Sequence, residues 1–314
     1  MSDVKYYTIS ISDEGQRLDN YLVKTLKGVP RSHIYRIIRG GEVRVNKKRA
    51  NPSIKLTQGD SIRVPPVRVS QQGSIFVSSK LEQQLKDAVI FEDNGLLVIN
   101  KPAGLAVHGG SGLNLGVIEA LRKMRSDLTY LELVHRLDRD TSGCLLIAKK
   151  RSVLRAIQAA LANHEVTKTY WALLNNPWQG NKIQVVNKSL QKNNLKSGER
   201  LVVIDEMGKP SQTSFKLLEN FLEACWAEVT PKTGRTHQIR VHSAFLGHPI
   251  IGDDKYGKSS TKASMIESKL RLYLHARAIQ FTLNGKIHRF EADLDDRFTL
   301  TIEQLRIRSL TSYE

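Results

Sequence analysis

Cysteine, acidic residues and long apolar runs are scarce in this 314-residue sequence. The two cysteines, Cys144 and Cys225, form no CxxC pair and stand in apolar or aromatic surroundings, so we expect buried thiols and no disulfide framework. The longest apolar runs fall far short of the ~20 residues that a membrane-spanning helix needs. The first ten residues lack the basic and then apolar pattern of a secretion signal. We therefore expect a cytoplasmic protein without a membrane partner.

Signatures of nucleotide cofactors and metal sites are also missing. The glycine-rich stretch at residues 109–116 satisfies neither GxGxxG nor GxxxxGK[ST], so we interpret it as a loop near the substrate. His108, His135, His237 and His242 match no common metal-ligand spacing, and we expect hydrogen-bonded structural histidines. The sequence therefore predicts neither a cofactor nor a bound metal.

Basic residues, by contrast, are abundant. The chain has 48 Lys and Arg against 31 Asp and Glu, a formal net charge of +17. Residues 16–70 alone hold thirteen Lys and Arg against three Asp and Glu. A strongly basic segment favours a polyanionic partner, because neutralised phosphates release their counterions. Charge alone does not distinguish RNA, DNA and an anionic membrane, but it does predict a separate module that faces nucleic acid.

Two short helices are predicted at the start of this basic segment. Leu18, Tyr21 and Leu22 give the first helix one apolar face. The second helix begins near Pro30 and ends at Gly40. Its apolar face is formed by isoleucines at the i, i+3, i+4 spacing, namely Ile34, Ile37 and Ile38.

Short strands follow the two helices, at residues 43–45 and 62–64, with a turn at Asn46 and Lys47. This element order and the sequence GGEVRVNKKR resemble the alpha-L RNA-binding domain, also called the "S-four" domain. The resemblance implies a small α/β RNA-binding domain at residues 16–70. The alternative is a solvated basic face, since basic side chains are ordinarily exposed. The candidate RNA contacts are Arg31, Arg36, Arg39, Lys47, Lys48 and Arg49.

The texture of the sequence changes on both sides of this module. We assign residues 1–15 to an N-terminal extension and residues 71–88, which are rich in Ser, Gln and Lys, to a linker. Residues 89–314 carry short apolar runs bounded by turn residues, such as 96–99 and 144–148. Because long helical stretches are few there, the sequence predicts a strand-rich α+β domain.

The densest cluster of charge lies in VHRLDRDTSG, at residues 134–143. This stretch places five ionisable side chains between two apolar runs. Asp140 and Ser142 also suit a tight turn, which Gly143 completes with a positive φ. The spacing alone therefore leaves a structural and a functional interpretation about equally open.

Four sequence blocks in a fixed order resemble the RluA-type family of RNA pseudouridine synthases. HRLDRDTSG is similar to the central motif of that family, and it is accompanied by KPAGLAVHGG at 101–110, KTYWALL from Lys168 and GRTHQIRVH at 234–242. The resemblance covers about residues 13–290. It implies a domain with a central, mostly antiparallel mixed β-sheet flanked by helices and loops. It also implies isomerisation of uridines at several sites of 23S ribosomal RNA.

The resemblance assigns the catalytic role to Asp138, a carboxylate that attacks or supports the sugar carbon, or deprotonates the sugar. Tyr170 corresponds to the aromatic residue that stacks on the target base and is a candidate for the late proton removal. Arg235 corresponds to the cation that pairs with Asp138 and keeps it ionised. Without the family context, Tyr170 would be a core aromatic and Arg235 a surface charge.

Three further residues are candidates for substrate binding. Arg136 either fills the space that a flipped uracil leaves or contacts a phosphate. Leu274 corresponds to the leucine that packs under the base, and Lys168 precedes Tyr170 in the KTY motif. A leucine in an apolar strand is otherwise a core residue.

Two other functions compete with this one. A non-catalytic ribosomal RNA-binding assembly factor would need the same basic module, but not the set Asp138, Tyr170 and Arg235. A DNA-binding regulator is disfavoured because no helix-turn-helix pair is evident. The RNA partner is either free or part of a large-subunit assembly intermediate. A monomer is expected, since no heptad pattern is present.

Overall fold

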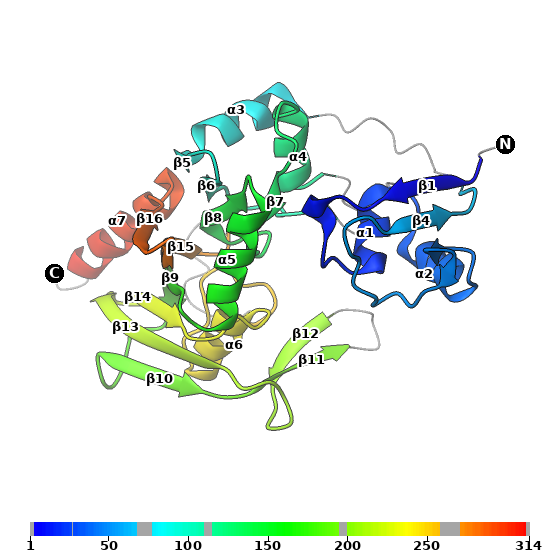
Figure 1. Ribbon diagram of the computed structural model, residues 1–314. Helices are drawn as coiled ribbons and strands as arrows, with labels where there is room; N and C mark the ends of the chain where they lie inside the picture. Colours follow the sequence, from blue (N-terminus) through cyan, green and yellow to red (C-terminus); the bar gives the residue numbers. More distant parts are fainter. Residues whose placement is uncertain are drawn as a thin grey trace. The chain divides into compact units, whose positions relative to one another are not determined.

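The computed structural model describes the chain in six segments and divides it into two compact units, Met1–Phe76 and Val77–Glu314 (Figure 1). None of the helices in these segments combines the length and apolarity that crossing a bilayer requires. Part of the glycine-rich stretch, part of the predicted linker and the polar stretch 258–270 lie outside them. The described residues are 3–26, 28–67, 77–109, 115–194, 200–257 and 271–311.

The small unit contains both helices that the apolar spacing predicts. α1 (Leu18–Thr25) and α2 (Arg31–Arg39) bury the residues of the predicted apolar faces. Asp19, at the start of α1, accepts hydrogen bonds from Arg17 Nη2 at 2.7 Å and from Tyr35 Oη at 2.8 Å. Because Tyr35 belongs to α2, this buried carboxylate joins the two helices.

A four-stranded antiparallel sheet of order β1-β4-β2-β3 completes the small unit. β1 (Lys5–Thr8) lies in the stretch predicted as a separate extension, yet all four of its residues pair with β4. The extension is therefore part of this sheet. Asn46 and Lys47 both have positive φ, as the turn between β2 and β3 requires. The other strands are β2 (Arg44–Val45), β3 (Lys48–Arg49) and β4 (Ser61–Val64).

The large unit is built on a ten-stranded sheet whose main path runs β10-β13-β14-β9-β15-β8-β6-β5, with β16 beside β15 and β7 beside β8. Among the described strands only β15 and β8 pair in parallel. This confirms the predicted mostly antiparallel, mixed sheet. The strands are β5 (Val89–Glu92), β6 (Leu96–Lys101), β7 (Glu132–Leu133), β8 (Ser142–Ala148), β9 (Thr167–Asn175), β10 (Ile183–Asn187), β13 (Gln212–Asn220), β14 (Ala224–Pro231), β15 (Leu274–Leu283) and β16 (Lys286–Glu291).

Helices pack on both sides of the sheet at β8, so this strand is buried on both faces rather than alternating. All seven residues of β8 are buried. Leu145 and Ile147 belong to the core that includes α3 and α4, whereas Leu146 belongs to the core that includes α5. The α+β architecture is thereby confirmed (Figure 1). The helices are α3 (Ser79–Asp87), α4 (Val117–Met124), α5 (Arg151–Ala162), α6 (Gln238–Phe245) and α7 (Asp296–Thr311).

Helix α3 occupies half of the predicted linker. Ser78 Oγ caps it by accepting a hydrogen bond from Leu81 N at 3.3 Å, and Leu85 is fully buried in the core shared with α4. A single buried leucine in a polar helix gives little periodic signal, which explains why the pattern suggested a tether. This half of the stretch belongs to the large unit.

The polar stretch at residues 175–200 contains β10 and the first strand of a two-stranded hairpin. The hairpin is formed by β11 (Leu190–Asn194) and β12 (Arg200–Ile204), and it is inserted between β10 and β13. Val202 of β12 is buried in a small apolar cluster with Leu190 and with Val241 of α6. The hairpin is therefore packed against the start of α6.

Candidate active site

The stretch VHRLDRDTSG connects β7 to β8, and its last two residues, Ser142 and Gly143, begin β8. Asp138 lies in its turn, where its carbonyl accepts a hydrogen bond from Thr141 N at 3.2 Å. Gly143 has φ +109°, and a Cβ atom there would lie 2.3 Å from the carbonyl oxygen of Ala276. Only glycine fits this close approach of β15. Strand and turn requirements therefore fix the backbone that carries Asp138.

A buried lysine stabilises the same turn through hydrogen bonds to backbone carbonyls. Lys101, at the end of β6, is completely buried, and its Nζ donates to the carbonyls of Pro102, Leu105 and Arg139 at 2.7 to 2.9 Å. Burial lowers the pKa of Lys101 to about 7, while the charges of Asp140 and Asp138 oppose that shift and Arg271 adds to it. The first sequence block, KPAG, is thus joined to the residue that follows Asp138.

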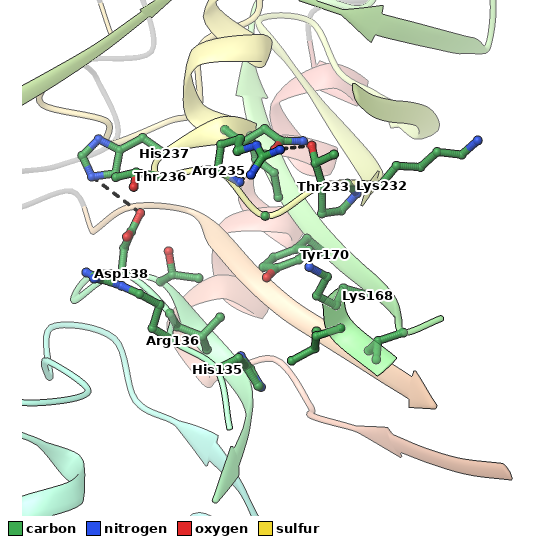
Figure 2. A pocket seen from close by; sticks show the side chains of 18 of the residues that line it. His135, Arg136, Asp138, Lys168, Tyr170, Lys232, Thr233, Arg235, Thr236 and His237 are labelled. Carbon is green, nitrogen blue, oxygen red and sulfur yellow. Dashed lines mark hydrogen bonds and ion pairs between the residues drawn. The ribbon is translucent and has the colours of Figure 1, made fainter. Parts of the chain in front are cut away.

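A cavity of about 570 Å³ opens beside Asp138 (Figure 2). Volumes of this order accommodate a small ligand, and a single flipped nucleotide is of that size. The cavity brings together all six residues that the sequence predicts for it: Arg136, Asp138, Lys168, Tyr170, Arg235 and Leu274.

One wall of the cavity is made by neighbouring strands. Lys168 and Tyr170 are two residues apart on β9 and so point to the same face of the sheet. Leu274, on the adjacent β15, pairs with Ala172 of β9 and is buried. Burial, followed by the charge of Asp138, raises the pKa of Tyr170, and burial lowers the pKa of Lys168. The phenol of Tyr170 therefore stays protonated at neutral pH.

A histidine side chain faces the carboxylate of Asp138. His237 Nε2 lies 3.8 Å from Asp138 Oδ2, and Figure 2 shows the ring facing the carboxylate. Burial lowers the pKa of His237, although the charge of Asp138 opposes that effect. The side chain of Asp138 is 25% exposed, so its carboxylate remains accessible from the cavity.

A buried arginine supplies positive charge near Asp138. Arg240, one helical turn after His237, forms a bidentate ion pair with Asp253 at 2.6 and 2.7 Å. Burial lowers the pKa of Arg240, but the hydrogen bonds and charge of Asp253, together with the charge of Asp138, raise it overall. Arg240 is therefore a fixed cation at the cavity.

Arg235 does not make the predicted ion pair with Asp138. Its Nε donates to the carbonyl of Pro210 at 3.2 Å, and the residue is exposed at the rim of the cavity. The block GRTHQIRVH contains two arginines, and the second of them, Arg240, is the buried one. His237 precedes α6 with a left-handed backbone, so residue spacing does not predict that its ring lines the cavity beside Arg240.

The cavity residues come from the region in which the chain matches known proteins. Ribosomal large subunit pseudouridine synthase C of Haemophilus influenzae is 52% identical over 310 residues, which cover 97% of this chain and 96% of the relative. The family of RNA pseudouridylate synthases matches at residues 95–245, and an S4 domain matches at residues 16–62. The chain belongs to the RNA pseudouridine synthase family. The predicted RluA-type membership is thereby confirmed.

A second relative and a solved structure support the same family assignment. Ribosomal large subunit pseudouridine synthase C of Escherichia coli is 49% identical over 310 residues and covers 96% of this chain and 97% of the relative. A solved structure of human RNA Pseudouridylate Synthase Domain Containing 4 superposes with a TM-score of 0.59 at 26% identity, over 72% of this chain and 96% of that one. The resemblance therefore holds in sequence and in fold.

The remaining histidines of this pseudouridine synthase differ in their surroundings. His135 Nε2 accepts a hydrogen bond from Leu146 N at 3.2 Å, and burial lowers the pKa of His135 to about 4. His242 is fully buried against Thr213 and has structural contacts only. Within the described segments, no group of three or more His, Cys, Asp or Glu side chains is arranged to hold a metal ion.

The S4 domain of this pseudouridine synthase presents its basic residues to solvent. These residues lie on α2, in the turn between β2 and β3, and on β3 itself. Arg39 additionally stacks over the ring of Tyr35 at 5.7 Å. The predicted RNA contacts in this domain are all exposed: Arg31, Arg36, Arg39, Lys47, Lys48 and Arg49.

Proposed function

We propose that this pseudouridine synthase isomerises uridines at several sites of 23S ribosomal RNA, with Asp138 acting on a flipped uridine. The observation that carries the proposal is the cavity in which Asp138, Tyr170 and Leu274 meet from three separate segments of the chain. The names of the relatives from H. influenzae and E. coli, 52% and 49% identical, specify the ribosomal large subunit. A protein that only bound RNA would not need this enclosed set.

The proposed reaction balances without electron transfer. The bond between uracil N1 and ribose C1′ breaks, the uracil turns, and a bond forms between C5 and C1′. The proton of C5 leaves to a base, and N1 takes up a proton. A carboxylate serves this sequence by attacking C1′ or by removing a proton from the sugar, and both routes begin with an ionised Asp138.

The other cavity residues hold the base and supply positive charge. Arg240 is a fixed cation at the cavity, and its charge attracts the carboxylate of Asp138. Tyr170 offers a neutral ring on the cavity wall against which uracil can stack, with Leu274 as the apolar floor. We propose that Arg136, exposed at the mouth, fills the space left by the flipped base. We assign contacts with the adjoining phosphates to Lys168 and Arg235.

Binding of structured RNA is assigned to the S4 domain. Its exposed cations on α2 and on the β2–β3 turn make phosphate contacts, which set affinity but not the choice of uridine. We also propose that the protein acts as a monomer in the cytoplasm, on 23S RNA that is either free or part of an assembly intermediate. Offering both substrates to the purified protein distinguishes the two forms.

The test is a map of pseudouridines by carbodiimide modification and primer extension on 23S RNA from a strain that lacks the protein. We expect specific pseudouridines to disappear, to return with the wild-type chain and to stay absent with Asp138→Asn. Asp138→Asn protein should still bind 23S RNA with wild-type affinity, which serves as the control. A full set of pseudouridines in the deletion strain would refute the proposed substrate, and full activity of Asp138→Asn would refute the choice of residue.

A further inference from the structure

The residue that opens α6 has an unusual backbone. His237 has φ +52°, the left-handed region that residues other than glycine seldom adopt. This conformation directs its ring toward Asp138, with Nε2 3.8 Å from Oδ2 (Figure 2). Strained conformations of this kind persist where the surroundings hold them in place. Here His237 is held by Tyr256, whose hydroxyl in turn binds the backbone amide of Val202.

The other ring nitrogen of His237 contacts Tyr256. His237 Nδ1 lies 2.8 Å from Tyr256 Oη, and the same hydroxyl accepts a hydrogen bond from Val202 N at 3.0 Å. A phenol has one proton to donate. Because Val202 N–H already supplies a proton to the oxygen, the tyrosine proton is available for Nδ1. In a neutral ring, Nδ1 is then the acceptor and Nε2 carries the hydrogen.

The lowered pKa of His237 agrees with a neutral ring that carries its hydrogen on Nε2. Burial lowers the pKa of His237, and the positive charges of Arg240 and Lys255 act in the same direction. The charges of Asp138 and Asp253 act in the opposite direction, and the pKa is lowered overall. The imidazole is therefore neutral, and its Nε2–H faces the carboxylate.

We propose that His237 and Tyr256 are positioning residues for Asp138, with Tyr256 holding the imidazole as the Nε2–H tautomer that donates to one carboxylate oxygen. This inference rests on the proposed function, in which Asp138 acts on the uridine. A single neutral donor fixes Oδ2 and leaves Oδ1 for the sugar, whereas a bidentate arginine would engage both oxygens. The 3.8 Å separation shortens when substrate closes the site, as catalytic hydrogen bonds do on complex formation.

The chain of contacts begins in the inserted hairpin. Val202 of β12 is held against α6 by its apolar contact with Val241, so the amide that donates to Tyr256 has a fixed position. Arg240 lies over the ring of Tyr256 at 5.2 Å and limits its rotation. The hairpin thereby contributes to the orientation of the catalytic carboxylate, although none of its described residues lines the cavity.

The experiment measures single-turnover rate constants of the full-length protein on a 23S RNA transcript. His237→Asn removes the Nε2 donor, and asparagine tolerates positive φ. We expect its rate constant to fall about 10- to 100-fold with unchanged RNA affinity, as for loss of a positioning contact. Tyr256→Phe should fall about 3- to 10-fold on the same grounds. His237→Gln, whose amide N–H reaches the position of Nε2, should recover part of the rate.

The two residues should act as one unit. We expect the double variant His237→Asn, Tyr256→Phe to be no slower than His237→Asn alone. Tyr273→Phe is the matched control, because the hydroxyl of Tyr273 contacts Thr301 away from the cavity. It should keep the wild-type rate. The inference would be overturned if the fold-losses of rate in the two single variants multiply in the double variant. It would also be overturned if a variant loses RNA affinity by the same factor as it loses rate.

A spectroscopic measurement tests the tautomer even if a variant folds poorly. In protein labelled with ¹⁵N-histidine, the His237 resonances are assigned by their loss in His237→Asn or in His237→Gln. We expect a protonated Nε2 and an unprotonated Nδ1 in the wild-type protein, and an Nδ1–H or doubly protonated ring would refute the proposal. If the deletion strain keeps every pseudouridine, the proposed function fails; if Asp138→Asn is active, the choice of Asp138 as the catalytic residue fails and the positioning role fails with it. If Asp138→Asn is inactive and His237→Asn is fully active, only the positioning role fails.

Discussion

The buried ammonium of Lys101 predicts a specific pH dependence of stability. Its pKa is lowered from 10.5 to about 7 in the folded protein, with burial as the largest cause. Between these two values the unfolded chain holds a proton that the folded chain has released. Stability must then rise with pH across this window, by about 1.4 kcal/mol per pH unit for one proton. Below about pH 7 the lysine is protonated in both the folded and the unfolded chain, so it no longer makes stability depend on pH.

The measurement compares the wild type with Lys101→Met, in which the titrating group is gone. Urea unfolding followed by tryptophan fluorescence reports on the large unit alone, because Trp171, Trp178 and Trp226 all lie in it. From pH 7.5 to 9.5 the stability of the wild type relative to the variant should rise by roughly 3 kcal/mol. Other groups that titrate in this range cancel in the difference.

Parallel stability curves for the two proteins would refute the reasoning, because they would mean that Lys101 releases no proton on folding in this range. Lys101→Gln provides a second comparison if the methionine variant is too unstable to measure. Both variants should also lose activity, since the carbonyl of Arg139, next to Asp138, loses its donor. A variant with wild-type activity would show that this contact does not position the turn.

Three further predictions follow from the packing of the site. Asp253→Asn leaves Arg240 buried with its pair weakened, and we expect a loss of about 3–5 kcal/mol in urea unfolding; a loss below 1 kcal/mol would contradict a buried pair. Gly143→Ala places a Cβ 2.3 Å from Ala276 O, so its melting temperature should fall by several degrees, and an unchanged value would contradict this close approach. Tyr170→Phe keeps the ring and removes the hydroxyl, so we expect wild-type RNA affinity with a reduced turnover rate; equal turnover would exclude the hydroxyl from proton removal.

The order of apolar residues within a segment was enough to predict α2 and β8. The isoleucines of α2 specify its inner face, and the run at residues 144–148 specifies a strand that is apolar on both faces. These signals depend only on neighbouring residues and on turn chemistry. The four sequence blocks located the cavity, because family resemblance carries information about residues that are far apart in the chain.

Long-range pairing was beyond the reach of these patterns. β1 has no feature of its own that shows it will pair with β4, about 55 residues later, so the sequence alone predicts an extension there. Arg235 and Arg240 are equivalent by residue type, and only the start of α6 at residue 238 decides which of them is buried. The ring of His237 faces Asp138 because of a left-handed backbone that no spacing rule predicts.

The parallel pairing of β15 with β8 has a consequence for synthesis of the protein. His275 and Ser142, which pair in this register and share a hydrogen bond, are 133 positions apart. At about 5–20 residues per second, the ribosome takes on the order of ten seconds to travel from one to the other. During that time the turn with Asp138 has emerged but lacks the wall that β15 provides. The nascent chain is therefore inactive until its last quarter has been translated, and protease protection of chains stalled before and after β15 would reveal this late step.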